Sequence, residues 1–229
     1  MQYVICCKYK YLFDVRIKVT ILWYYFLMEI ILATQNLDKT KEFTKLLNTD
    51  QISLIPISQF GINMDIEETG KTYQENALLK ARYAHQQLPH KSILADDSGL
   101  SIDVLDGYPG IYSARFAGLN TPYKDKIEEI WHLLEPFEQK NWHASFHCSL
   151  VYIDASGQEK TFNAACNGII IPEMRGKNGF GYDPIFYVPE YKMTTAEMEP
   201  ELKNRISHRG QATKLWKDYM LALENSYDK

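Results

Sequence analysis

The amino-acid sequence predicts an α/β fold in which helices flank a mixed β-sheet, and three observations support this class. From residue 28 onward, short apolar runs of strand length alternate with segments that carry apolar residues at helical spacing. A T-x-x-E capping box marks the start of one helix. Two alternating runs separated by a short turn have the form of a long β-hairpin. The pattern does not determine the order of the strands.

The first half of the pattern begins with an apolar strand and a loop that leads into a helix. Phe43 keeps helical spacing with two leucines, and Pro56 favours an edge strand because proline has no N–H for a sheet hydrogen bond. Thr72 and Glu75 are the capping box, and the helix that they open ends before Pro89. In chain order we expect a strand at 29–33, a helix at 40–48, a strand at 52–58, a strand end and turn at 64–70, and a helix at 73–88.

The second half contains the hairpin and a glycine-rich loop. Thr121 and Pro122 open a helix, because proline suits the first helical turn. The apolar stripe of this helix comprises Ile127, Ile130, Trp131 and Leu134, and the last helix of the chain is expected to bury Leu215, Tyr219 and Leu223 on one face. In chain order we expect a strand at 91–95, a turn at 96–99, an alternating continuation at 100–105, the helix from 121, paired strands at 143–154 and 160–171, the loop at 175–184, a strand at 185–188 and the last helix.

Composition narrows the class of protein. The formal net charge of −4 speaks against a protein that coats nucleic acid by bulk positive charge, although a local basic pocket for one phosphorylated molecule stays open. No repeat or low-complexity tract indicates a solenoid or a disordered chain. The four cysteines have neither CxxC spacing nor the density of a disulfide framework, so we expect a reducing, cytoplasmic location.

Residues 1–27 differ from the rest, with four basic residues against one acidic residue and an apolar run at their end. The run at 19–33 is interrupted by Glu29, is shorter than the roughly 18 apolar residues of a membrane span, and lacks an A-x-A cleavage site. We therefore expect no signal peptide and no membrane segment. We expect Met28 to be the natural start, residues 1–27 to be an extension outside the native domain, and residues 28–229 to form a single domain.

Two acidic pairs are candidate metal ligands. A single aspartate before Ser-Gly is often an ordinary turn former, but Asp96 and Asp97 together repel each other unless a cation or a shared proton relieves them. Glu67 and Glu68 form a second pair at an expected strand end, with a solvated turn as the equal alternative. Oxygen ligands without a Cys/His cluster favour Mg²⁺, which one or two carboxylates hold together with substrate phosphates.

Basic and aromatic residues supply the complementary groups. Asn76 and Lys80 lie one helical turn apart and share a face. The glycine-rich loop offers Phe180 and Tyr182 for stacking and Asp183 as an acceptor, although core aromatics in a plain loop are the alternative. The candidate phosphate contacts, each of which is more often a solvated surface residue, are Lys39, Lys80, Lys177, Lys203 and Arg209. Neither a complete G-x-G-x-x-G nor a Walker A motif is present.

Five ordered stretches carry a resemblance to a known family: LATQNLDKTKEF, EETGKTYQENALLKA, ADDSGLSIDVLDGYPGIYSARFAG, GFGYDPIF and ISHRGQA. From Met28 to about Leu223 the chain resembles the non-canonical purine NTP pyrophosphatases, the HAM1-like family of inosine and xanthosine triphosphate pyrophosphatases. The resemblance implies an elongated mixed sheet in two lobes with an active-site cleft between them. It also implies Mg²⁺-dependent hydrolysis of ITP, dITP and XTP to the monophosphate and pyrophosphate, which removes deaminated purines from the nucleotide pool, and a homodimer without a nucleic-acid partner.

The same resemblance assigns roles to individual residues. Asp97 becomes the general base or its metal-linked equivalent, with Glu68 and Asp96 as further metal ligands. Phe180 would stack on the purine. The substrate-binding residues implied are Thr34, Gln35, Asn36, Leu37, Asp38, Lys39, Lys80, Ser98, Phe180, Gly181, Tyr182, Asp183, Lys203, His208 and Arg209. Lys177 matches no motif position.

One departure concerns Gln35, since the family commonly has glycine there, which tolerates a positive φ and lets phosphate approach. Two other function classes remain open. A phosphohydrolase that forms an aspartyl-phosphate normally uses D-x-D rather than adjacent aspartates, and it releases orthophosphate. A catalytically silent nucleotide-binding module would bind ITP without hydrolysis.

Overall fold

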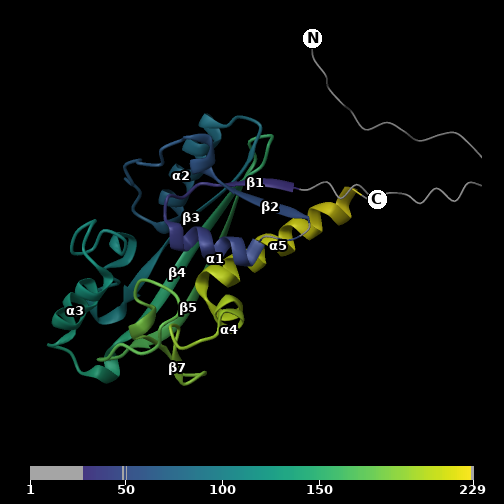
Figure 1. Ribbon diagram of the computed structural model, residues 1–229. Coiled ribbons are helices and arrows are strands. Elements are labelled where there is room, and N and C mark those ends of the chain that lie inside the picture. The colour runs from purple at the N-terminus through teal and green to yellow at the C-terminus, as the bar shows by residue number, and fades with distance from the viewer. Residues whose placement is uncertain (1–27, 48, 50, 228–229) are drawn as a thin grey trace, which may run out of the picture.

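The computed structural model describes residues 28–47, 49 and 51–227, and a mixed sheet forms its centre (Figure 1). The order of the strands is β2-β1-β3-β4-β5-β6-β7, with β2 and β3 parallel to β1 and all later neighbours antiparallel. The strands are β1 (Met28–Leu32), β2 (Ile52–Pro56), β3 (Ser92–Ile102), β4 (His143–Ile153), β5 (Glu159–Ile170), β6 (Phe186–Val188) and β7 (Met193–Thr194). The α/β class is confirmed, and β2 with its proline is an edge strand as expected.

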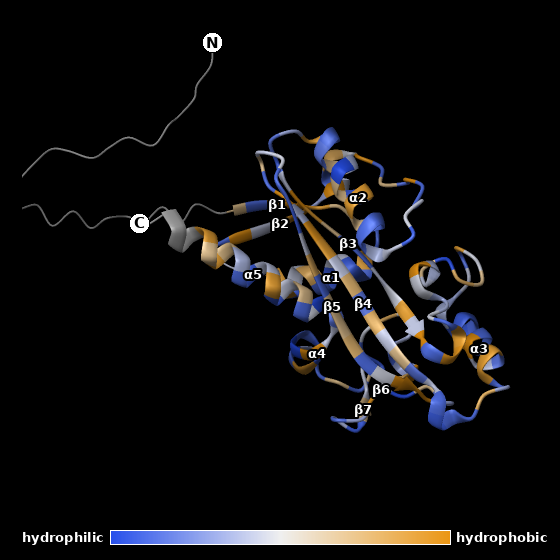
Figure 2. Ribbon diagram, turned by 180° about the vertical axis from the view of Figure 1, so that it is seen from behind, coloured by the Kyte–Doolittle hydropathy of each residue, from blue (hydrophilic) through white to orange (hydrophobic). Residues whose placement is uncertain are grey.

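Five α-helices flank this sheet. They are α1 (Leu37–Leu47), α2 (Tyr73–Gln87), α3 (Tyr123–Leu134), α4 (Pro200–Ile206) and α5 (His208–Tyr227). Figure 1 shows α1 and α5 crossing the sheet on one face, and Figure 2, turned by 180°, shows α2 on the other. Within the described part of the chain, no helix is long and apolar enough to span a membrane.

Alternation along the central strands divides the core between these faces. Leu94 and Leu150 pack against α1 and α5, whereas Ile93, Ala95 and Val151 pack against α2. Further along the strands, a third cluster joins β3, β4 and β6 to α3. The helices change between hydrophilic blue and hydrophobic orange around their surface, as expected for one buried stripe (Figure 2).

Three expectations for individual elements are wrong. The residues at 64–70 form no strand, because this loop runs from the 3-10 helix Ile57–Phe60 to α2 without pairing with the sheet. The predicted turn at 96–99 is instead the middle of β3, where β4 pairs with all four residues. On the last helix, Leu215 is 45% exposed; Ala212 and Trp216 face the core, together with Tyr219 as predicted.

The predicted hairpin is confirmed, since β4 and β5 pair over their whole length from His143↔Ile169 to Ile153↔Glu159. Thr72 caps α2 by accepting a hydrogen bond from the Glu75 N–H at 3.1 Å. The expected extension at 1–27 lies outside the described residues, so its status stays a prediction.

The unequal lengths of β1 and β3 open one edge of the sheet. β1 ends at Leu32, opposite Leu94, and the Ala33 N–H donates to the Leu94 carbonyl at 2.8 Å. β3 runs on to Ile102 beside β4 alone, so the loop after β1 faces the free edge at Asp96 and Asp97. The two aspartates point to opposite faces of the sheet, yet both stand at this edge.

Candidate active site

The loop from Thr34 to Lys39 joins β1 to the start of α1 and is shaped by its own side chains. The Thr34 hydroxyl accepts from the Asn36 N–H at 3.2 Å. The Asn36 Oδ1 accepts from the Asp38 and Lys39 N–H groups, both at 3.0 Å, as an N-terminal helix cap does. Helix N-termini carry partial positive charge, so this loop presents a favourable place for phosphate.

The remaining positions of this loop lie away from the buried site. Leu37 is 74% exposed, and Asp38 pairs with Lys41 on the surface of α1 at 3.0 Å. Gln35 does not have a positive φ, so its backbone does not require glycine. Its Nε2 donates to Asn63 Oδ1 at 2.5 Å, which ties the loop to the segment before α2.

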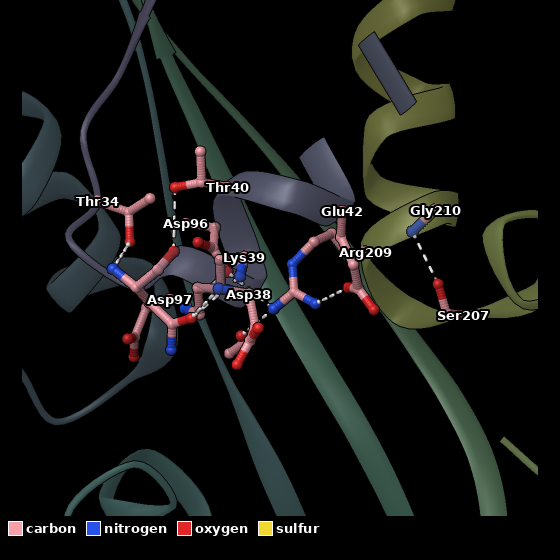
Figure 3. Close-up of polar contacts among 12 residues, drawn as sticks. Thr34, Asp38, Lys39, Thr40, Glu42, Asp96, Asp97, Ser207, Arg209 and Gly210 are labelled. Atoms are coloured by element: carbon pink, nitrogen blue, oxygen red, sulfur yellow. Dashed lines mark hydrogen bonds and ion pairs between the residues drawn. The ribbon is translucent and has the colours of Figure 1, made fainter. Parts of the chain in front are cut away.

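Asp96 lies on the α1/α5 side of β3 and is completely buried between cations (Figure 3). Lys39 Nζ is 2.9 Å and Arg209 Nη2 is 3.4 Å from its Oδ2. Burial opposes ionisation, but Lys39, Arg209 and Lys80 together outweigh it and hold the pKa of Asp96 well below its usual range. Asp96 is therefore a fixed negative charge that organises the cations around it.

Asp97 lies on the α2 side, where Lys80 Nζ contacts its Oδ1 at 2.6 Å. The same ammonium is 2.8 Å from Glu68 Oε1, and Arg115 pairs with the other oxygen of Glu68. Burial raises the pKa of Asp97 despite the nearby lysines. Burial also favours a higher pKa for Glu68, but the charges of Lys80 and Arg115 outweigh burial, so the pKa of Glu68 is lowered.

The expected metal ligands Glu68, Asp96 and Asp97 lie on two sides of β3. Among the described residues, no three His, Cys, Asp or Glu side chains form a ready-made metal cluster. Lys80 instead joins Glu68 and Asp97, and Asp96 faces the other side of β3. However, Asp97 Oδ2 and Asp96 Oδ1 are buried without a hydrogen-bond partner among the described residues. Such a set fits a cation that arrives with phosphate oxygens, because Mg²⁺ needs only one or two protein carboxylates.

A cavity opens beside Lys39 and Arg209, the two cations that pair with Asp96, on the α1/α5 side, where the α3 cluster meets these helices. It brings together ten of the predicted site residues: Asn36, Lys39, Ser98, Phe180, Gly181, Tyr182, Asp183, Lys203, His208 and Arg209. Arg209 also donates to the Ser98 hydroxyl at 2.8 Å. Thr34, Gln35, Leu37, Asp38 and Lys80 do not line this cavity. The exposed Lys177 does not line it either.

The glycine-rich loop places an aromatic ring within reach of two cations. Lys203 Nζ lies 5.5 Å and the Arg209 guanidinium carbon 5.7 Å from the centroid of Phe180. Asp183 Oδ2 accepts from the Phe180 N–H at 2.8 Å and from Lys203 at 2.6 Å. Gly179 has a φ of +75°, and a Cβ there would lie 2.1 Å from Asp183 Oδ2, so this turn requires glycine.

Sequence reasoning missed Glu42 and Arg115. Glu42 accepts from Arg209 at 2.6 Å (Figure 3). It also accepts from Lys203 at 2.5 Å, and so connects α1 to both α4 and α5. Its position three residues after Lys39 places it on the same helix face, which is a signal that could have found it. Arg115 lies within one of the family-like stretches, but its pairing with Glu68 depends on the tertiary structure.

His208 is the one histidine in the lining of the cavity. It stacks on Phe146 with ring centroids 4.9 Å apart and is 7% exposed. Burial, with the neighbouring Arg209 and Lys203, lowers the pKa of His208 well below its ordinary value. The ring is therefore neutral at physiological pH.

This burial predicts a pH-dependent stability. Below about pH 6.5 the unfolded chain protonates His208 while the folded protein does not, so the free energy of unfolding falls as pH drops from 6.5. The contribution is about 1.4 kcal/mol per pH unit until the folded pKa is reached. Urea titrations between pH 7.5 and 5.5 will measure it, and the difference from His208→Gln isolates this residue. Parallel pH profiles for both proteins contradict the prediction.

Comparisons with known proteins agree with this geometry. The Ham1 family model matches residues 30–219. A dITP/XTP pyrophosphatase from Coxiella burnetii is 45% identical over 192 residues, which cover 81% of this chain and 93% of that protein. A dITP/XTP pyrophosphatase from Bacillus cereus is 42% identical over 188 residues, covering 80% and 90%.

Solved structures are similar over the same part of the chain. The structure of a HAM1 protein from Coxiella burnetii superposes with a TM-score of 0.77 at 42% identity, covering 86% of this chain and all of that one. The Staphylococcus aureus Ham1 protein gives a TM-score of 0.75 at 38% identity, covering 85% and 98%.

Proposed function

The chain belongs to the Ham1 family, and we propose that it hydrolyses ITP, dITP and XTP to the nucleoside monophosphate and pyrophosphate. One observation carries the proposal: a cavity whose aromatic ring, Phe180, lies near the cations Lys203 and Arg209 continues, through Lys39, to a pair of buried aspartates. This is the sequence of environments that a purine, its sugar and a chain of phosphates require. Removal of deaminated purines from the nucleotide pool is the corresponding role.

The purine stacks on Phe180, and buried donors read its 6-position. Arg209 Nε and His208 Nδ1 are buried without hydrogen-bond partners among the described residues. The 6-oxo group of hypoxanthine or xanthine accepts from the Arg209 N–H, and from His208 when its proton is on Nδ1, whereas the 6-amino group of adenine is itself a donor. Guanine has the 6-oxo group, so its rejection rests on its 2-amino group, through crowding by the backbone or lost hydrogen bonds. An unmatched buried polar group costs about 1 to 3 kcal/mol, which is roughly ten- to a hundredfold in discrimination.

The phosphates lie along the loop at the start of α1. Asn36 shapes this N-terminus, and Lys39 presents its ammonium between the cavity and Asp96. Glu68 and Asp97, with Asp96 nearby, are the residues that would hold Mg²⁺. When bound, Mg²⁺ neutralises phosphate charge and polarises the phosphoryl oxygens. Lys80 balances the carboxylates in its absence.

Asp97 Oδ2 accepts the proton of the attacking water. Its Oδ1 is held by Lys80, which leaves the second oxygen without a partner among the described residues. Burial disfavours its ionised form, which makes it a stronger base than an exposed aspartate at the same position. The water lies in line with the bond between the α-phosphorus and the leaving pyrophosphate. A cytoplasmic homodimer belongs to the same proposal.

Product analysis tests the reaction. The purified protein is incubated with ITP, dITP, XTP, ATP and GTP in Mg²⁺, and released monophosphate, pyrophosphate and orthophosphate are separated. We expect pyrophosphate from the first three, with kcat/KM for ATP and GTP lower by at least roughly tenfold. Orthophosphate release would favour an aspartyl-phosphate enzyme, and tight ITP binding without turnover would favour a silent binding module.

A further inference from the structure

The loop that carries Glu68 has no regular secondary structure between Gly61 and Lys71. Glu68 nevertheless meets Lys80 at 2.8 Å, and Lys80 meets Asp97 at 2.6 Å. Its end is fixed by the start of α2, where Lys71 N–H donates to Glu75 Oε2 at 2.5 Å.

A second contact between this loop and α2 comes from a buried side-chain amide. Asn76 is completely buried, and its Oδ1 accepts from the Gly70 N–H at 2.8 Å. Because a backbone N–H can only donate, this contact determines which end of the amide faces the loop. Asn76 lies one helical turn before Lys80, on the same face of α2. Its Nδ2 has no partner among the described residues, so Gly70 alone orients the side chain.

The approach of Gly70 to α2 is closer than any side chain permits. A Cβ on Gly70 would lie 2.5 Å from Asn76 Oδ1 and 2.7 Å from Glu75 Cβ. The loop backbone therefore rests directly on the first turn of the helix. Glu68 lies two residues before Gly70. The distance between its carboxylate and Lys80 therefore depends on the contact between Gly70 and Asn76.

We propose that Asn76 is a positioning residue, which holds the Gly70 backbone so that Glu68 reaches Lys80 beside Asp97. The catalytic consequence rests on the proposed function. Asn76 does not line the cavity beside Phe180, so its loss leaves the nucleotide-binding residues in place. The effect belongs to kcat and not to the KM for nucleotide.

The first measurement compares turnover of Asn76→Ala and Gly70→Ala with that of Gln74→Ala. The Gln74 variant is the control, since it removes the Asn163–Gln74 hydrogen bond of the same helical turn without touching the loop. We expect both loop-contact variants to lose roughly 10- to 100-fold in kcat with KM for ITP unchanged. The control keeps the turnover of the unaltered protein. Equal kcat in all four proteins overturns the proposal.

A double-mutant cycle shows whether Asn76 acts through Glu68. In a Glu68→Gln background, Asn76→Ala is expected to add no more than about a further twofold loss, because the carboxylate that it positions is already gone. A full additive loss means that Asn76 supports the fold in general, and this contradicts the proposal.

Hydrogen exchange gives a readout that does not depend on turnover. The amide of Gly70 should exchange faster in Asn76→Ala, and protection should return in Asn76→Asp, which retains the accepting oxygen. Unchanged exchange in Asn76→Ala overturns the proposal even if the protein hydrolyses no nucleotide. Absent ITP hydrolysis in the unaltered protein, with the expected exchange pattern, rejects the proposed function alone.

Discussion

Asp97→Asn is expected to lower kcat for ITP by roughly 10²- to 10⁴-fold while the protein stays folded and retains nucleotide. The amide cannot accept the proton of water, and it is a poor ligand for a cation that arrives with the phosphates. Lys80 keeps Glu68 as its partner at 2.8 Å, so the substitution leaves no buried ammonium without a counter-charge. The binding residues in the cavity do not include Asp97.

The measurement is steady-state kinetics together with nucleotide affinity for the unaltered protein, Asp97→Asn and Asp103→Asn. Asp103 is an exposed aspartate that follows the same strand, so its variant controls for the loss of one negative charge. A kcat for Asp97→Asn within a few-fold of the control contradicts the assignment of the base. Loss of nucleotide affinity with unchanged kcat does so as well.

Asp96→Asn is expected to have its main effect on stability, lowering the free energy of unfolding by about 3 to 5 kcal/mol. Asp96 is the buried counter-charge of Lys39 at 2.9 Å and of Arg209 at 3.4 Å, and Arg209 is itself only 2% exposed. Removal of one partner from a buried ion pair leaves an uncompensated charge out of water. Glu42 still contacts Arg209 at 2.6 Å, but its carboxylate is already shared with Lys203 at 2.5 Å.

Urea unfolding at pH 7 measures this difference, with Asp218→Asn as the control. Asp218 forms an exposed pair with Lys214 at 2.6 Å on α5, and such pairs contribute at most about 1 kcal/mol. Asp97→Asn should also lose less than Asp96→Asn, because burial raises the pKa of Asp97 and its ionised form does not stabilise the fold. Equal losses for Asp96→Asn and Asp218→Asn contradict the prediction.

The two neighbouring aspartates show how far the site follows from sequence. Adjacent like charges predicted Mg²⁺ beside them, which stays a prediction, and in the structure Lys39, Lys80 and Arg209 supply the counter-charges. The predicted turn between strands was wrong, because β4 pairs with β3 through this stretch and sheet pairing prevails over the local preference of Asp-Ser-Gly. Asp96 and Asp97 have different roles because they point to opposite faces of β3. No local sequence pattern shows which face carries which partners.

The sequence by itself determined the alternation of elements, the capping box, the hairpin, the family and ten residues of the cavity, because these depend on periodicity, local hydrogen bonds and long motifs. Only the tertiary structure decided the contacts made across distant segments. Glu42 reaches Lys203 and Arg209, Arg115 reaches Glu68, and the Glu68 loop rests on α2 without forming a strand. The ion pairs among these contacts join residues far apart in the chain, and each forms only because charge pairing in the folded interior offsets the cost of desolvation, which a single sequence does not encode locally.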